Sequence, residues 1–206
     1  MKKLLTLIIV IVGFSVITFA QTNSTLDEKV EKFLREHKDE WHDLNVPFVD
    51  GQTLHDLIVK NKYTSALEIG TSTGHSTIWL AWAMSKTGGK VTTLEMNKQR
   101  QKQAIKNLTE IGLIGYVDAR LGDAHALVKE LPGPFDFVFS DADKNWLKQY
   151  FLDVTPKLKT GGCYTTHNVI DGNSPQDYLD FVQNNPAFQT TIDRKSRAGI
   201  MISYKK

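Results

Sequence analysis

Residues 65–77 read SALEIGTSTGHST, and the rest of the chain is organised around this stretch. A short apolar run ends in a turn punctuated by Gly70 and Gly74, and the apolar sequence IWLAWAM follows at 78–84. This order predicts a strand, a tight loop and a helix. In an open α/β sheet such a loop lies at the carboxyl end of the strand, where glycine lets the backbone approach a ligand and the helix N-terminus offers free N–H groups. The stretch therefore predicts a cofactor site.

The glycine spacing argues against a dinucleotide cofactor. A dinucleotide fingerprint needs G-x-G-x-x-G, whose second glycine lets the backbone approach the pyrophosphate, and Ser72 occupies that place. The pattern Glu68-x-Gly70-x-x-x-Gly74 instead resembles the first motif of class I S-adenosylmethionine methyltransferases. The resemblance makes S-adenosylmethionine the expected cofactor and Glu68, Gly70, Ser72 and Gly74 candidate binding residues. The alternative is a purely structural glycine turn.

The amino terminus differs from the rest of a globular composition. Of the 206 residues, 41% are hydrophobic and 23% charged, which suits one domain of ordinary size. Residues 1–20 carry Lys2 and Lys3 before an uncharged apolar run that ends in small residues, which predicts a secretory signal and export to the periplasm. The alternative is a membrane anchor, since the run approaches the roughly 20 residues a bilayer requires. A methyltransferase domain over 21–206 is expected.

Charge and cysteine content restrict the partners. Residues 1–20 contain two lysines and no acid, so the remaining chain has equal numbers of basic and acidic residues. No basic stripe predicts nucleic-acid binding, and a single cysteine, Cys163, excludes an intramolecular disulfide. Because S-adenosylmethionine is made in the cytosol, export conflicts with the expected cofactor, and a cytoplasmic location or a tether facing the cytoplasm stays open.

The chain alternates between helical and strand patterns without a repeat. Helices are expected over 25–41, 52–60 and 98–111, from the end of the turn at 122–125 through 131, and over 146–158 and 176–184. Strands are expected over 65–69, 90–95, 117–121, 135–140, 163–166, near 190 and over 200–204. Such alternation predicts a largely parallel sheet covered by helices on both faces. Glu95 ends the second strand about 20 residues after Gly74, where a carboxylate can accept both ribose hydroxyls of a nucleoside.

Several motifs now fall in one order, and over residues 45–206 the chain resembles the catechol and caffeoyl-CoA O-methyltransferases, a cation-dependent class I family. The resemblance rests on the sequences NVP (45–47), LEIGTSTGHS (67–76), GDA (122–124), FDFVFSDADK (135–144) and GG (161–162) leading to His167-Asn168, together with Glu95. It implies a Rossmann-like fold with a seven-stranded, mostly parallel sheet. The run DADK after a strand is the most specific of these motifs.

The resemblance also implies roles at matching positions. Val46, Gly70 and Ser76 would line the methionine end of the cofactor, and Glu95 would bind its ribose. The adenine would meet Asp123 and Ala124.

The same resemblance implies a metal site and a base. Asp141 matches the first metal ligand and lies near the cofactor amine, and Asn168 matches the last ligand. Lys144 matches the lysine that takes the substrate hydroxyl proton. His167 departs from the family, which usually has Asp-Asn where this chain has His167-Asn168. Imidazole suits Mn²⁺, Co²⁺ or Zn²⁺ better than Mg²⁺, so we expect a softer cation than magnesium or a weakened site.

Two alternatives remain open at this point. One is a metal-independent methyltransferase with His167 or Lys144 as the base. The other is an exported or tethered binding protein that keeps the fold without turnover, although a pure binder needs no base.

The expected substrate is a small phenol such as a catechol. The link 169–175 is shorter than the insertion that helps form the substrate pocket and dimer contact of plant caffeoyl-CoA enzymes, which disfavours bulky CoA esters. Trp146 and Tyr150 lie one helical turn apart and either wall a flat substrate or pack in the core. His125 is interpreted as a packing or surface residue, and a homodimer stays open.

Overall fold

The computed structural model describes residues 26–41 and 44–206, so the expected signal or anchor over residues 1–20 lies outside the described residues. Two compact units divide the chain at residue 40. Within the first unit, residues 26–36 form a helix, which ends five residues before the predicted boundary at 41. Among the described helices, none combines the length and apolar character needed to cross a bilayer. All further description concerns residues 41 and 44–206.

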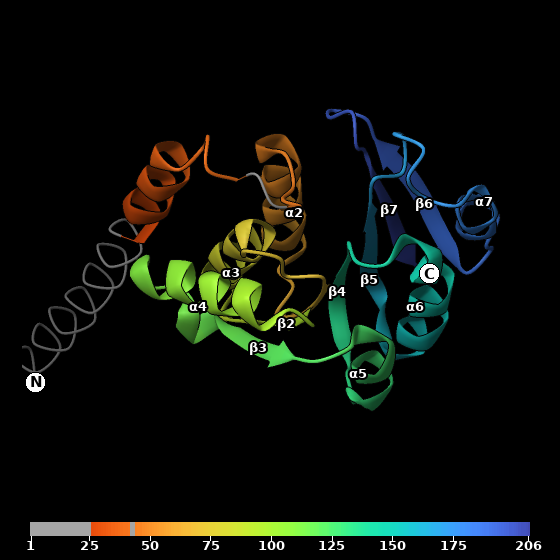
Figure 1. Ribbon diagram of the computed structural model, residues 1–206. Coiled ribbons are helices and arrows are strands. Elements are labelled where there is room, and N and C mark those ends of the chain that lie inside the picture. The colour runs from red at the N-terminus through yellow and green to blue at the C-terminus, as the bar shows by residue number, and fades with distance from the viewer. Residues whose placement is uncertain (1–25, 42–43) are drawn as a thin grey trace, which may run out of the picture. The chain divides into compact units, whose positions relative to one another are not determined.

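The second unit is a seven-stranded α/β sheet, as predicted (Figure 1). Its strands are β1 (Ser65–Ile69), β2 (Lys90–Glu95), β3 (Val117–Leu121), β4 (Phe135–Ser140), β5 (Leu158–His167), β6 (Phe188–Asp193) and β7 (Ile200–Lys205). Their order in the sheet is β3-β2-β1-β4-β5-β7-β6. Strand β7 pairs antiparallel with both β5 and β6, whereas the other pairings are parallel. The carboxyl ends of β1 to β5 therefore meet at one edge.

Helices cover both faces of the sheet. They are α2 (Phe48–Asn61), α3 (His75–Thr87), α4 (Lys98–Glu110), α5 (Ala124–Glu130), α6 (Leu147–Val154) and α7 (Gln176–Gln183). Helices α2, α3 and α4 lie on one side in Figure 1, and α5, α6 and α7 on the other. The latter face buries the large side chains Tyr150, Phe151, Tyr164 and Tyr178. Burying a side chain of this size contributes roughly 1.5–3 kcal/mol, so apolar packing fixes the helices against the strands.

Helix α2 begins at Phe48, four residues before the predicted start at Gln52. The carbonyl oxygen of Pro47 accepts the N–H groups of Asp50 and Gly51 at 3.0 and 3.1 Å, so the helical turn starts directly after the proline. A proline in this place reads as a turn from the sequence, but its fixed φ also suits a helix start. The correction matters because it puts Asp50 on the helix.

Strand β5 begins at Leu158 rather than at the predicted Cys163. Leu158 pairs with Phe135 and Cys163 with Phe137, so the register shifts in the segment that contains Gly161 and Gly162. Glycines inside a strand commonly mark a bulge, whereas the sequence pattern alone suggested a boundary. The predicted helix over 146–158 is correspondingly shorter, because α6 stops at Val154 and the 3₁₀ turn Thr155–Lys157 leads into the strand.

Candidate functional site

A cavity of about 840 Å³ opens at the carboxyl edge of the sheet, within the range typical of small-molecule sites. It is lined by the segments that follow β1, β2, β3, β4 and β5. Strand β1 lies between β2 and β4. The chain passes from β1 to β2 through α3 on one face of the sheet, and from β3 to β4 through α5 on the other face. Such a switch point is where open α/β sheets bind ligands.

Most of the residues predicted from the sequence line this cavity. They are Gly70, Ser72, Glu95, Asp123, Ala124, Asp141, Lys144, His167 and Asn168. Four other predicted cofactor residues do not line it: Val46, Glu68, Gly74 and Ser76. The structure therefore brings the proposed cofactor residues and the DADK motif to one cavity, and it assigns supporting contacts to the remaining four.

Gly70 and Glu95 fix the shape of the glycine loop. Gly70 has a φ of +103°, and a Cβ at this position would lie 2.6 Å from the carbonyl oxygen of Asp141, so only glycine fits between the ends of β1 and β4. The Glu95 carboxylate accepts the backbone N–H of Ser72 at 2.8 Å and that of Asn97 at 2.8 Å. Each carboxylate oxygen keeps a further lone pair for a hydroxyl group, so Glu95 suits the predicted ribose contact.

The four predicted residues that do not line the cavity make contacts that stabilise the glycine loop and the start of α3. Glu68 is fully buried, and its Oε2 accepts hydrogen bonds from Thr77 and Thr93 at 2.5 Å each. Burial raises the pKa of Glu68 to about 7, against the opposing effect of its hydrogen bonds. Gly74 begins α3 at a φ of +96°, and a Cβ there would meet Ala104 of α4 at 3.0 Å.

The loop before α2 is tied to α3 by a histidine. The backbone oxygen of Val46 accepts the Nδ1–H of His75 at 2.9 Å, and Trp79 Nε1 donates to His75 Nε2 at 3.4 Å. The buried ring is therefore the neutral tautomer with its proton on Nδ1. Burial lowers the pKa of His75 to about 4. Ser76 is buried beside it and hydrogen-bonds Glu68.

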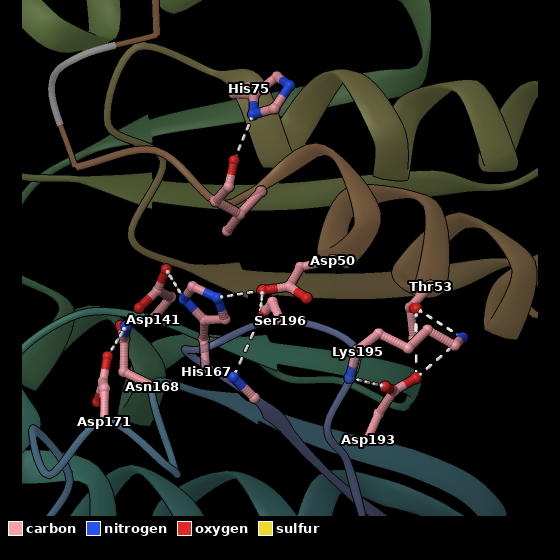
Figure 2. A network of polar contacts seen from close by, with 12 residues as sticks. Asp50, Thr53, His75, Asp141, His167, Asn168, Asp171, Asp193, Lys195 and Ser196 are labelled. Carbon is pink, nitrogen blue, oxygen red and sulfur yellow. Dashed lines mark hydrogen bonds and ion pairs between the residues drawn. The ribbon is translucent and has the colours of Figure 1, made fainter.

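A cluster of polar side chains lies where β4 and β5 end, and Figure 2 shows the contacts of Asp141, His167 and Asp50 within it. Lys144 Nζ donates to Asp141 Oδ1 at 2.5 Å and to the backbone oxygen of His167 at 3.4 Å. The His167 ring lies between two carboxylates, with Nδ1 3.1 Å from Asp141 Oδ2 and Nε2 2.8 Å from Asp50 Oδ2. Asp50 comes from α2 and was not predicted as a site residue. The cluster thus joins α2 to the ends of β4 and β5.

Charge governs the ionisation of this cluster. Burial alone would lower the pKa of His167, but the hydrogen bonds and charges of Asp141 and Asp50 outweigh it and raise the pKa to about 9. Burial alone would raise the pKa of Asp141, but the His167 hydrogen bond and the Lys144 charge lower it below its usual value. The two carboxylates therefore favour a positive charge between them, whether it is carried by a proton or by a cation.

The predicted metal ligands offer a mixed donor set. Among residues 26–41 and 44–206, no three His, Cys, Asp or Glu side chains are arranged to hold a metal ion. The predicted set has two such side chains, Asp141 and His167, and an amide, Asn168. Asn168 Nδ2 donates to Asp171 Oδ2 at 2.8 Å, which leaves the amide oxygen for a ligand. Carboxylate oxygen, imidazole nitrogen and amide oxygen together fit a borderline divalent cation.

Sequence reasoning missed other cavity residues. His125, interpreted as a packing or surface residue, lines the cavity and lies 3.3 Å from Asp123 and 3.4 Å from Asp143. Its ring packs against Trp146 and Tyr150, at 4.3 and 5.7 Å between centroids. Tyr150 lines the cavity, whereas Trp146 packs against the core. No pattern in the sequence distinguishes such a histidine from a surface one.

Two exposed apolar side chains also line the cavity. Leu44 and Met96 are 74% and 75% exposed. Because large apolar side chains at a cavity rim gain from being covered, they provide a surface for a flat ligand group. Neither residue belongs to a periodic pattern in the sequence.

The family assignment agrees with this geometry. The model of the O-methyltransferase family matches residues 10–178. A catechol O-methyltransferase from Niastella koreensis is 39% identical over 128 residues, 60% of this chain and 56% of that protein. A caffeoyl-CoA O-methyltransferase from Eucalyptus globulus is 28% identical over 138 residues, 65% and 56% of the two chains. The match thus spans little more than half the length of these curated relatives.

Solved structures give the same result for the fold. The O-methyltransferase from Bacillus cereus, solved in complex with SAH, superposes with a TM-score of 0.71 at 26% sequence identity, over 89% of this chain and 91% of that chain. The family model covers well over half of the chain, and strands β1 to β5, the glycine loop and the DADK segment lie in the matching region. The chain belongs to the O-methyltransferase family.

Proposed function

We propose that this chain transfers a methyl group from S-adenosylmethionine to a hydroxyl of a small, catechol-like phenol, with a divalent cation at the β4–β5 end of the cavity. The observation that carries the proposal is that one cavity contains both Glu95 with the glycine loop and the Asp141–Lys144–His167 cluster. SAH, which the Bacillus cereus relative holds, is the product that S-adenosylmethionine leaves after methyl transfer. The Niastella koreensis relative supports a catechol as the acceptor.

The order of the strands in the sheet supports a particular placement of the parts of S-adenosylmethionine along the cavity. From β3 across β2 and β1 to β4 and β5, the strand ends carry first Asp123 and Ala124, then Glu95, then Gly70, and finally Asp141 and His167. Asp123 and Ala124 would then hold the adenine, Glu95 the ribose, and the loop at Gly70 the methionine part. Asp141 and His167 would lie at the end of the cavity that receives the acceptor.

S-Adenosylmethionine, when bound, supplies an electrophilic methyl group on a positively charged sulfur. Glu95 orients the cofactor, because its carboxylate is fixed by two backbone N–H groups and its free lone pairs accept the ribose hydroxyls. Gly70 lets the loop lie close to Asp141, which shortens the distance between cofactor and acceptor subsites. Holding donor and acceptor in line is itself a large part of catalysis in such transfers.

The acceptor end requires a proton to leave the phenol. Asp141, His167 and Asn168 would hold a divalent cation, whose Lewis acidity would make a catechol hydroxyl more acidic. Lys144 is placed to take that proton, since Asp141 Oδ1 and the His167 carbonyl oxygen hold its Nζ at this end of the cavity. Tyr150 and His125 provide aromatic surface in the same cavity, where His125 contacts both Asp123 and Asp143.

Calorimetric titration of the whole chain with S-adenosylmethionine and with SAH tests the cofactor part of the proposal. We expect both to bind, and we expect Glu95→Ala to weaken both. Glu110→Ala serves as the control, because Glu110 is an exposed acid at the end of α4. If folded protein binds neither compound, the proposed function is wrong. Addition of 3,4-dihydroxybenzoate with and without Mn²⁺ then separates a metal-dependent acceptor site from the metal-independent alternative.

A further inference from the structure

We propose that Asp50 is a positioning residue that presents His167 Nδ1 to the cation and thereby makes the site prefer a borderline metal such as Mn²⁺, Co²⁺ or Zn²⁺ over Mg²⁺. The inference rests on the proposed function, because it assigns the metal preference of that same site. Asp50 lies on α2, 117 residues before His167, and belongs to none of the motifs that carry the family resemblance. Its contacts and burial carry the argument.

Asp50 is a buried acid whose partners converge on one oxygen. Its Oδ2 accepts the Nε2–H of His167 at 2.8 Å and the hydroxyl of Ser196 at 2.7 Å. The side chains of Asp50 and His167 are only 3% and 4% exposed. Ser196 is itself held by Gly199, whose N–H donates to its Oγ at 3.1 Å. Because a buried carboxylate is costly without such partners, Asp50 has one favourable orientation, and Figure 2 shows it directed at His167.

This contact determines which nitrogen of His167 faces the cavity end. With the Nε2 proton committed to Asp50, Nδ1 is the nitrogen turned to Asp141, 3.1 Å from Oδ2. A histidine that binds a metal almost always donates its other ring N–H to a carboxylate or carbonyl group, which fixes the ring and strengthens its donor. The Asp50–His167 pair has this arrangement. Asp171 does the same for Asn168, since it accepts the amide N–H and leaves the amide oxygen free.

The charges at this end of the cavity favour a divalent ion. Once a metal ion has replaced the Nδ1 proton of His167, three carboxylates, Asp50, Asp141 and Asp171, stand against the ammonium of Lys144. A divalent cation balances this excess. The nitrogen donor then sets the choice of ion, because Co²⁺ and Zn²⁺ suit a site with imidazole, Mn²⁺ accepts it beside oxygen ligands, and Mg²⁺ prefers oxygen ligands alone.

The test compares metal binding by wild type, Asp50→Asn and His167→Asp, measured with Mn²⁺ by electron paramagnetic resonance and with Mg²⁺ in competition. Asp50→Asn should weaken Mn²⁺ binding by roughly 10- to 100-fold, as loss of an outer carboxylate does in other metal sites. His167→Asp replaces the nitrogen donor with a carboxylate oxygen and should shift the preference toward Mg²⁺. Asp56→Asn is the matched control, since Asp56 also contacts a histidine, His55 at 2.9 Å, but is an exposed residue of the same helix.

If Asp50 had only a structural role, Asp50→Asn would lower the free energy of unfolding without changing the ratio of Mn²⁺ to Mg²⁺ affinity. Asp50→Glu retains the carboxylate and should recover part of the Mn²⁺ affinity, and it provides the measurement if Asp50→Asn does not fold. The inference is overturned if wild type that binds SAH binds no Mn²⁺, or if the metal ratio is the same in wild type and His167→Asp. Titration of SAH in the same samples separates failure of this inference from failure of the proposed function. If wild type does not bind SAH, the proposed function is contradicted.

Discussion

Replacing Gly70 with alanine tests whether the close approach of β1 and β4 creates the site. The new Cβ would lie 2.6 Å from the backbone oxygen of Asp141, a separation that requires the backbone to move. Forced overpacking costs roughly 1–3 kcal/mol. The φ of +103° adds roughly 1–2 kcal/mol, because a side chain disfavours this region. We therefore expect Gly70→Ala to lose about 2–5 kcal/mol of unfolding free energy.

Two other glycines separate these contributions. Gly88 has a φ of +74° and open space around its Cβ position, so Gly88→Ala should cost only the roughly 1–2 kcal/mol of backbone strain. Gly115 has open space and no positive φ, so Gly115→Ala should stay within about 0.5 kcal/mol of wild type. Denaturant unfolding measures all three variants.

The binding consequence of Gly70→Ala is specific to the site. Displacing the Asp141 backbone moves both the glycine loop and the Asp141–Lys144–His167 cluster. SAH affinity should therefore fall by about tenfold or more, equivalent to roughly 1.4 kcal/mol. Gly88→Ala and Gly115→Ala should retain it. The reasoning is refuted if Gly70→Ala unfolds at the same denaturant concentration as Gly88→Ala and binds SAH as wild type does.

Three further outcomes are expected. Lys144→Met should lower methyl transfer by roughly 10²–10⁴-fold, the usual contribution of a proton-transfer group, while SAH affinity stays within a few-fold; equal loss of both in a titration would contradict a role as base. Glu95→Ala should weaken SAH binding more than it lowers turnover at saturating cofactor, and an unchanged binding isotherm would argue against the ribose contact. The folded pKa of His75, about 4, lies below its unfolded value near 6.5, so its stabilising contribution is present above pH 6.5 and is lost as the pH falls to 4, by up to about 3 kcal/mol; unfolding of His75→Asn should depend less on pH over this range, and an identical dependence would contradict the assignment.

Local pattern was enough to predict most of the sheet. The bounds of β2, β3 and β4 match the predicted ranges, because turn residues at Gly88-Gly89, Gly122 and 132–134 mark where these strands begin or end. Strand β5 did not follow this rule, since the glycines at 161 and 162 form part of the strand rather than its start. Two adjacent glycines indicate a flexible backbone, but they do not show whether the strand begins before or after them. Pairing with β4 decides this, and the strand begins before them.

The candidate site also contains residues that could be predicted from the sequence and one that could not. The residues at strand ends, such as Glu95, Asp141 and His167, were predictable because parallel strands bring their carboxyl ends to one edge. Asp50 was not, since its partner is distant in the chain. One signal was available: Asp50 precedes Leu54 and Ile58 by four and eight residues, which puts an acid on the buried face of α2. A charged residue on an apolar face needs a partner, and that partner is His167.

The central claim is tested most directly by incubating the purified whole chain with S-adenosylmethionine, 3,4-dihydroxybenzoate and Mn²⁺ and measuring both products by mass spectrometry. We predict that SAH and the O-methylated benzoate form in equal amounts, that Lys144→Met forms far less of both, and that a monophenol lacking the adjacent hydroxyl is a poor acceptor. Folded, cofactor-binding protein that forms no methylated product from any catechol offered would contradict the proposal.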